Sequence, residues 1–312
     1  MDNSIIHLLN GDHELSREMK KYIATPWCNC NGEYKSCMEC KPPLKKINDQ
    51  GIQAHGGDLF QHSQWSALYL FNWFKNKKSP YNKLHKLLVA IIDSRLLNAI
   101  ISTDEDIKLG FLLLCGFMHD ICKGGDGIYD MYAKNKYGKK LTDADHPAAC
   151  KQTLIEPGNR YNGMLKTTLN AILANYVNKP KALAIMALCA AVHWNFGKLN
   201  IPKERGGWTP QQYLDSIHKE KLDIEKRLNI KLIDTENVLI KLCMAIGASD
   251  VASSYNDELH SRFLPKGVRL AQKTHLSNGA SWTQHKFNKN HKKYITLVLK
   301  RKQKAQKRTR KK

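Results

Sequence analysis

The stretch GFMHDICKGGD, residues 116–126, decides how this chain folds and what its core contains. It follows the apolar run LGFLLLC, residues 109–115, so it ends a helix that is apolar on nearly every side and should be central. That helix nevertheless ends in His119, Asp120 and Lys123. Burying ionisable groups is costly unless a partner compensates them. A metal ion is one partner that suits both imidazole and carboxylate, so the stretch indicates a buried polar site.

The sequence around this stretch is helical in pattern. Apolar residues recur every three or four positions, and Asp, Thr and Pro mark helix starts. We expect helices over residues 59–74, with Asp58 as the cap, over 83–101, and over 103–122, with a Thr103–Asp106 capping box. A further helix begins at residue 146, another covers 181–194, a charged one ends at about 228, and the last covers 235–255. YITLVL, residues 294–299, suits either one short strand or a helical turn. The predicted fold class is all-α.

Charge divides the 312-residue chain unevenly. The formal net charge is +22, but after Glu258 there are 17 Lys and Arg and no Asp or Glu. The first 258 residues therefore hold 33 basic and 28 acidic groups and are nearly balanced. We expect a Cys-rich segment over residues 1–50, a helical catalytic domain over 51–260 and a basic, partly disordered tail over 261–312.

The sequence favours a soluble intracellular protein, cytoplasmic or nuclear. The start MDNSIIHLLNGDHE is acidic and lacks a long apolar core, unlike a secretory signal. The longest apolar run, ALAIMALCAAV at 182–192, is too short to span a bilayer, so no membrane association is predicted. Nine cysteines, an odd number, fit a reducing interior better than a disulfide scaffold. Nothing in the pattern favours a particular oligomeric state.

Four more ionisable residues stand where separate helices can supply them to the same site. They are His62 in LFQHSQWS, His146 in DADHPAAC, His193 in AAVHWNFG and Asp250 in IGASDVASS. Two interpretations stay open at this point: polar residues satisfied inside the core, or ligands of a metal centre.

The order of these residues resembles the HD-domain metal-dependent phosphohydrolase superfamily. His62, then His119-Asp120, then Asp250 match that family's order, and HDICK fits its His-Asp-x-x-Lys form. His146 and His193 lie where the branch with two metals has two additional histidines. The resemblance covers about residues 55–255 and implies an HD-domain-like helical bundle.

The resemblance also implies a ligand set and a chemistry. One metal would be held by His62, His119, Asp120 and Asp250, and a second by His146 and His193 with Asp120 bridging. Two divalent transition-metal ions (Fe, Mn, Zn, Co or Ni) would bind phosphate oxygens and activate a water. Asp120 and Lys123 would be the catalytic residues, with Lys123 stabilising charge on the phosphoryl oxygens.

The predicted function is hydrolysis of a phosphate ester. The substrate would be a phosphorylated small molecule, a nucleotide, a cyclic or dinucleoside phosphate, or an oligonucleotide end. Two alternatives come from other classes: an HD-fold di-iron oxygenase, and a degenerate HD module that binds nucleic acid. Oxygen consumption would identify the first, and a metal-free core the second.

Three further segments carry motifs outside this pattern. Cys28, Cys30, Cys37 and Cys40 suit a structural zinc site, with free thiols as the alternative. The loop 124–145 interleaves tyrosines with lysines, which suits base stacking or a plain solvated loop. The basic tail suits a contact with nucleic acid or another polyanion, a nuclear-localisation signal, or a solubilising segment.

Overall fold

The computed structural model describes residues 3–21, 59–75, 77, 82–123, 146–199 and 207–254. Within these ranges all regular structure is helical and no strand occurs, which confirms the all-α prediction for this part of the chain. None of the helices in these ranges has both the length and the apolar character needed to cross a membrane.

In chain order the helices are α1 (Asn3–Asn10), α2 (Glu14–Met19), α3 (Leu59–Lys75), α4 (Asn82–Ile92), α5 (Arg95–Ile100), α6 (Glu105–Met118), the 3₁₀ turn η1 (Ile121–Lys123), α8 (His146–Ile155), α9 (Met164–Leu173), α10 (Lys179–Lys198), α11 (Pro210–Leu228) and α12 (Val238–Ser254).

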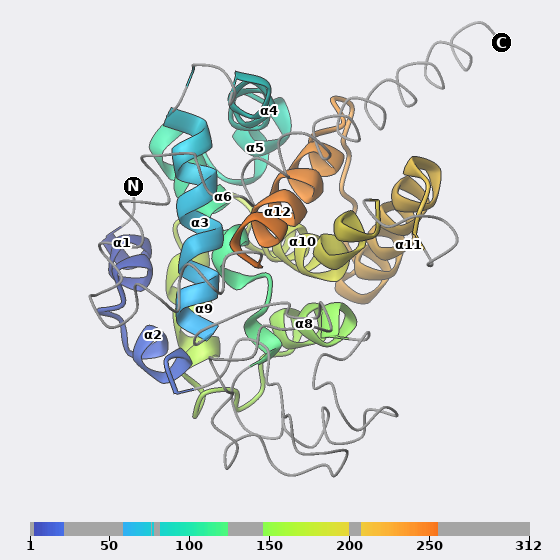
Figure 1. Ribbon diagram of the computed structural model, residues 1–312. Helices are drawn as coiled ribbons and strands as arrows, with labels where there is room; N and C mark the ends of the chain where they lie inside the picture. The colour runs from blue at the N-terminus through green and yellow to red at the C-terminus, as the bar shows by residue number, and fades with distance from the viewer. Residues whose placement is uncertain are drawn as a thin grey trace, which may run out of the picture.

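Four helices, α3, α6, α10 and α12, form the centre of the bundle (Figure 1). Helix α10 packs against α12, α8 and α11, while α3 packs against α6, α12 and α4. The short helices α1 and α2 lie beside α3 and contribute Ile5, Leu8, Leu15 and Met19 to the same buried core.

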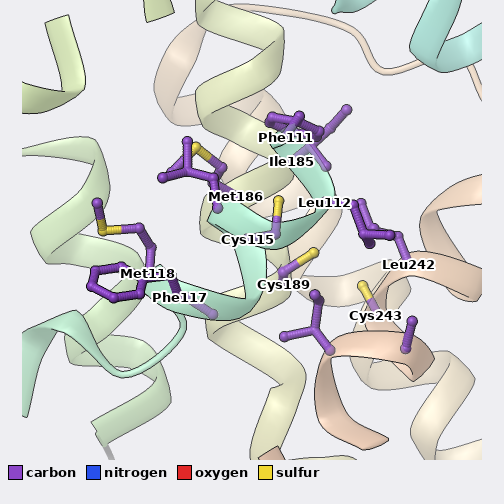
Figure 2. Close-up of a cluster of buried hydrophobic side chains, with 14 of the residues drawn as sticks. Phe111, Leu112, Cys115, Phe117, Met118, Ile185, Met186, Cys189, Leu242 and Cys243 are labelled. Atoms are coloured by element: carbon purple, nitrogen blue, oxygen red, sulfur yellow. The ribbon is translucent and has the colours of Figure 1, made fainter. Parts of the chain in front are cut away.

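Helix α6 is buried along most of its length, as its sequence predicted. Its side chains from Lys108 to Met118 are all buried. Figure 2 shows Leu112 and Cys115 facing Cys189 of α10 and Cys243 of α12. Burial raises the pKa of the Cys189 and Cys243 thiols well above the usual value, so both stay protonated and pack as small apolar groups.

Helices α10 and α12 approach each other closely at Gly247. A Cβ atom at this position would lie 2.8 Å from the carbonyl oxygen of His193 and 2.5 Å from Cβ of Phe196. Only glycine leaves room for the backbone there. This contact brings His193 on α10 near Asp250, which lies three residues after Gly247 on α12.

Some element boundaries differ from the sequence prediction. Residues 83–101 form two helices, because the Ser94 side chain accepts a hydrogen bond from Leu97 N and so caps α5. Asp104, not Thr103, caps α6 by accepting bonds from the amides of Asp106 and Ile107. Helix α6 ends at Met118 and not near 122, and α9 was not predicted.

Several predictions lie outside the described residues. They concern the cysteine group at residues 28–40, the Asp58 cap, the loop 124–145, the segment 294–299 and the basic tail. These, and the division into domains, stay predictions.

Candidate metal centre

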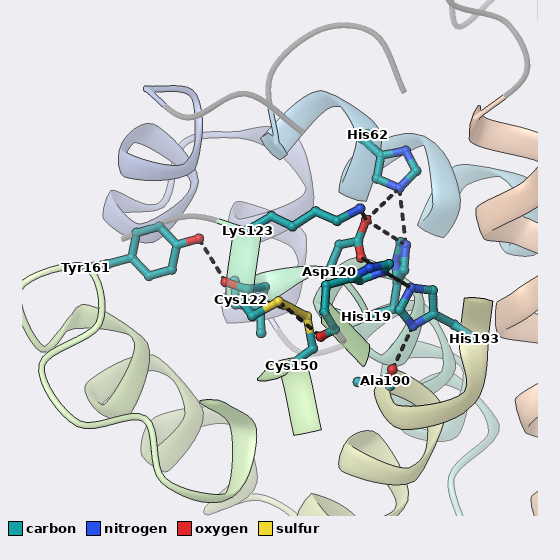
Figure 3. Close-up of a disulfide and its surroundings, with 11 residues drawn as sticks. His62, His119, Asp120, Cys122, Lys123, Cys150, Tyr161, Ala190 and His193 are labelled. Carbon is teal, nitrogen blue, oxygen red and sulfur yellow. Dashed lines mark hydrogen bonds and ion pairs between the residues drawn. A yellow bond between two sulfur atoms is a disulfide. The ribbon is translucent and has the colours of Figure 1, made fainter. Parts of the chain in front are cut away.

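Six predicted ligands converge from five places in the fold. His62 comes from the first turns of α3, His119 and Asp120 follow the end of α6, and His146 begins α8. His193 lies near the end of α10 and Asp250 in the second half of α12. None of the six is more than 4% exposed. Figure 3 shows the side chains of His62, His119, Asp120 and His193 pointing toward one another.

The first group consists of His62, His119, Asp120 and Asp250, which offer ligand atoms within 4.8 Å of one another. Nε2 of His62 lies 3.2 Å from Nε2 of His119. Oδ1 of Asp250 lies 3.3 Å from each of these two nitrogens. Oδ2 of Asp120 completes the group at 3.3 Å from His62 Nε2 and 3.6 Å from His119 Nε2.

The second group uses the other oxygen of the same carboxylate. Oδ1 of Asp120 lies 3.3 Å from Nε2 of His193 and 3.5 Å from Nε2 of His146. The two imidazole nitrogens are 3.1 Å apart. Asp120 therefore stands between the two groups and turns one oxygen toward each.

Hydrogen bonds at the opposite ring nitrogens set the tautomers of His119 and His193. Nδ1 of His119 lies 2.7 Å from the carbonyl oxygen of Gly116, and Nδ1 of His193 lies 2.7 Å from that of Ala190. A carbonyl oxygen only accepts, so each Nδ1 carries the proton. In the neutral rings, Nε2 then presents a lone pair to the centre, as metal-ligating histidines do.

Ser253 has the same effect on His62. Its hydroxyl donates to the carbonyl oxygen of Asp250 at 2.8 Å, and its oxygen lies 3.2 Å from Nδ1 of His62. Because the only hydroxyl proton is used, the oxygen accepts from Nδ1–H of His62. Nε2 of His62 thus faces the carboxylates of Asp120 and Asp250.

The donor geometry fits divalent transition metals. Two ligand atoms about 2.1 Å from one ion are about 3.0 Å apart at a right angle and about 3.4 Å apart at a tetrahedral angle. Most of the distances, 3.1–3.3 Å, lie between these limits. The two longer ones, 3.6 Å from Asp120 Oδ2 to His119 Nε2 and 3.5 Å from Asp120 Oδ1 to His146 Nε2, lie slightly above them. Burial lowers the pKa of His62, but its hydrogen bonds to Asp120 and Asp250 outweigh burial and raise it, so a cation bound here would replace a proton on Nε2. The buried His and Asp groups can therefore hold a metal ion.

Electrostatics keep the two carboxylates ionised. Burial opposes ionisation of Asp120, but the charge of Lys123, together with His119, His193 and His62, holds its pKa well below the usual range. Burial likewise opposes ionisation of Asp250, yet His119 and His62 hold its pKa well below the usual range. Burial dominates at His119 and lowers its pKa, so this imidazole is neutral near pH 7. Anionic carboxylates and a neutral imidazole are the ligand forms that bind cations.

Lys123 contacts the carboxylate that lies between the two groups. Its Nζ is 2.6 Å from Oδ2 of Asp120, three residues earlier, and the side chain is 1% exposed. This ion pair fixes one oxygen of Asp120 and places a positive charge at the edge of the centre.

Two contacts that the sequence did not predict hold the segment 119–123. Cys122 forms a disulfide with Cys150 of α8, a pairing that the sequence analysis did not predict. The Tyr161 hydroxyl donates to the carbonyl oxygen of Ile121 at 3.1 Å. Both contacts are visible in Figure 3, and they attach η1 to α8 and to the turn after it. Because His146 begins α8, the same contacts fix His146 relative to Asp120.

No protein-family profile, no curated protein and no solved structure matches this chain.

Sequence reasoning found the six converging residues but missed those that orient them. Ser253 is the one residue with a readable signal, since it lies three positions after Asp250 and so shares its helix face. The carbonyl groups of Gly116 and Ala190 leave no signal, because every residue carries one. The Cys122–Cys150 pair is separated by 28 positions, and spacing alone does not pair cysteines.

Proposed function

We propose that this chain is an HD-type metal-dependent phosphohydrolase or phosphodiesterase. Its substrate would be the phosphate ester of a nucleotide, a cyclic or dinucleoside phosphate, or an oligonucleotide end. One observation carries the proposal. The two oxygens of Asp120 face separate histidine pairs, His62 with His119 and His193 with His146. A carboxylate in that position suits two ions held side by side.

Each ion would have its own ligands. His62, His119, Asp120 and Asp250 would hold the first, and Asp120, His146 and His193 the second. Imidazole with carboxylate suits Fe, Mn, Zn, Co or Ni. Two such ions supply Lewis-acid activation of a phosphoryl group and lower the pKa of a water.

The protein's own residues would orient the reacting groups and exclude water. Hydrogen bonds at Nδ1 hold His119 and His193 in the ligating tautomer. Lys123 fixes one oxygen of Asp120, and its ammonium group is close enough to the centre to stabilise negative charge that develops on a phosphoryl oxygen. The centre is lined by side chains that are almost fully buried, which strengthens these electrostatic contacts.

The substitution Asp120→Ala tests this proposal. We expect loss of hydrolysis of bis(p-nitrophenyl) phosphate and a fall from about two bound ions per chain to one or none, because both ions would lose the shared ligand. Metal content is measured by atomic emission after reconstitution under each candidate metal. Asp215→Ala, an exposed carboxylate on α11 that accepts a bond from Gln211, is the matched control. Full activity in Asp120→Ala would refute the proposed site.

The same ligand set favours one second candidate. Two metal ions that are held by histidines and joined by one carboxylate would also suit a di-iron oxygenase. Oxygen uptake by the Fe(II)-loaded protein, without phosphoester hydrolysis under any metal, would select it. A chain that binds no metal, yet binds RNA or DNA through residues 261–312, would instead be a nucleic-acid-binding protein.

A further inference from the structure

Two tryptophans and a lysine lie next to the second histidine pair. Trp194 follows His193 on α10, and its ring centroid is 5.5 Å from that of His146. Nζ of Lys198, one turn later, lies 4.8 Å from the Trp194 ring centroid and 4.3 Å from that of Trp208. The amide of Trp208 donates to the carbonyl oxygen of Lys198 at 3.0 Å, which ties the second tryptophan to the end of α10. We call Trp194, Lys198 and Trp208 the tryptophan–lysine cluster.

The charge of Lys198 is not neutralised by acidic side chains in the described part of the chain. Its contacts there are the two indole rings, and no carboxylate of those residues forms an ion pair with it. Lys151 is different, since Glu220 and Asp223 both pair with it. Burial lowers the pKa of Lys198, the direction expected where aromatic rings replace carboxylates as neighbours.

Exposure leaves the cluster accessible to a ligand. Trp194, Lys198 and Trp208 are each half-buried, whereas His146 and His193 are buried. An indole face stacks on any nucleobase, and a lysine attracts the phosphate, so a stacked base would displace the Lys198 ammonium from the Trp194 ring toward the phosphate. Because Trp194 contacts His146, a base stacked here would belong to the molecule whose phosphate reaches the metal centre.

We propose that the tryptophan–lysine cluster is the base- and phosphate-binding part of the substrate site, so that the substrate is a nucleoside phosphate. This inference rests on the proposed function, and it selects nucleotides among the phosphate esters considered above. Trp194 stacks the base, and Lys198 binds a phosphate oxygen. Trp208 also contacts the Lys198 ammonium.

The test compares two ligands that differ only in the base. Isothermal titration calorimetry of AMP and of ribose 5-phosphate is carried out on the full chain loaded with Mn²⁺, and the ligand is recovered afterwards to check for hydrolysis. One stacked base favours AMP by roughly 5- to 100-fold. Trp194→Leu should reduce this preference to less than about threefold, while Trp194→Phe should retain most of it.

The lysine has a separate signature. Lys198→Gln should raise the dissociation constants of AMP and ribose 5-phosphate by the same factor and leave the ratio of the two constants unchanged, because it removes only the phosphate contact. Lys166→Gln, on the exposed face of α9, is the matched control and should change neither ligand. Thermal melting and metal content of each variant exclude misfolding as the cause.

The outcomes separate this inference from the proposed function. If the protein hydrolyses phosphodiesters but binds AMP and ribose 5-phosphate equally, the base-binding role of the tryptophan–lysine cluster is refuted and the proposed hydrolase function stands. If AMP is preferred through Trp194 but the protein hydrolyses no phosphate ester, the base-binding role of the cluster stands and the proposed hydrolase function is refuted. A preference that survives Trp194→Leu would place the base elsewhere.

Discussion

Single hydrogen bonds decide which nitrogen of each histidine faces the centre. His119 and His193 use carbonyl groups three residues earlier on their own helices, so their orientation follows from helix geometry alone. His62 depends on another helix, because Ser253 on α12 accepts its Nδ1 proton. That difference makes Ser253 the most informative single residue to change.

Ser253→Ala should lower the affinity for the first ion roughly 10- to 100-fold, the usual cost of losing a hydrogen bond to a metal ligand. His62 would keep its place but lose the acceptor that fixes its tautomer. Competition with a metallochromic indicator measures the affinity. Ser249→Ala is the control on the same helix, since Ser249 bonds to Ser66 and to the carbonyl oxygen of Ile246. Equal losses in both variants would contradict a specific role for Ser253.

The residue scale is also where the sequence was most informative. His119, Asp120 and Lys123 were conspicuous because they end an apolar helix, where unpaired charge is costly. The two carbonyl acceptors and the Cys122–Cys150 bond could not be predicted, since they depend on the three-dimensional path of the chain.

Helix packing sets the distance between the two histidine pairs. Helices α10 and α12 touch at Gly247, and η1 is attached to α8 by the Cys122–Cys150 disulfide. Helix boundaries were harder to predict than helix positions. Local bonds made by Ser94 and Asp104 shifted the start of α5 and α6, because such side chains compete with the helix backbone for hydrogen bonds.

Gly247→Ala should destabilise the fold by about 1–3 kcal/mol, because the new Cβ meets the His193 carbonyl oxygen, which cannot rotate away. It should also lower the affinity for the second ion, because it displaces His193. Gly116→Ala is the control: its Cβ meets Leu70 Cδ1, a flexible side-chain end, and helix propensity favours alanine by about 1 kcal/mol. Urea denaturation measures both. Equal stability of the two variants would contradict a tight α10–α12 contact.

The attachment of α8 to α11 should respond to pH. Burial opposes the charge of Lys151, but Asp223 and Glu220 raise its pKa, and Lys151 in turn lowers the pKa of Asp223. The Asp223 contribution is therefore present above pH about 4 and is lost as pH falls through its lowered pKa. The Lys151 contribution is present below pH about 10 and is lost as pH rises through its raised pKa.

The variant Lys151→Met isolates this contribution. Its melting temperature should lie below that of the wild type between about pH 5 and 9, and the gap should shrink below about pH 4 as Asp223 is protonated. Lys166→Met on α9 is the control. A gap that does not change with pH would indicate that lost packing, not the ion pair, causes the effect.

At the scale of the whole molecule, the candidate ligands connect most of the central helices. They come from α3, the end of α6, α8, α10 and α12, which are separated by up to about 190 residues in the sequence. The all-α class followed from helical periodicity. The convergence of six residues was implied by their resemblance in order to the HD-domain superfamily, to which the cost of buried charge added support. The order in which the helices pack could not be predicted from the sequence, because apolar faces of similar composition can pair in several ways.

Bound metal should therefore stabilise the entire bundle. Ions that bind the folded chain at 1,000 times their dissociation constant add about 4 kcal/mol per site, equivalent to roughly 8–16 °C in melting temperature for a chain of this size. Removing both ions with EDTA should lower the melting temperature by up to twice this amount, and adding Mn²⁺ back should restore it. Asp120→Ala should show little response to either treatment, because both sites share that carboxylate. An identical EDTA response in Asp120→Ala and wild type would show that the stabilising metal binds elsewhere, since the bundle would then be cross-linked without its central ligand.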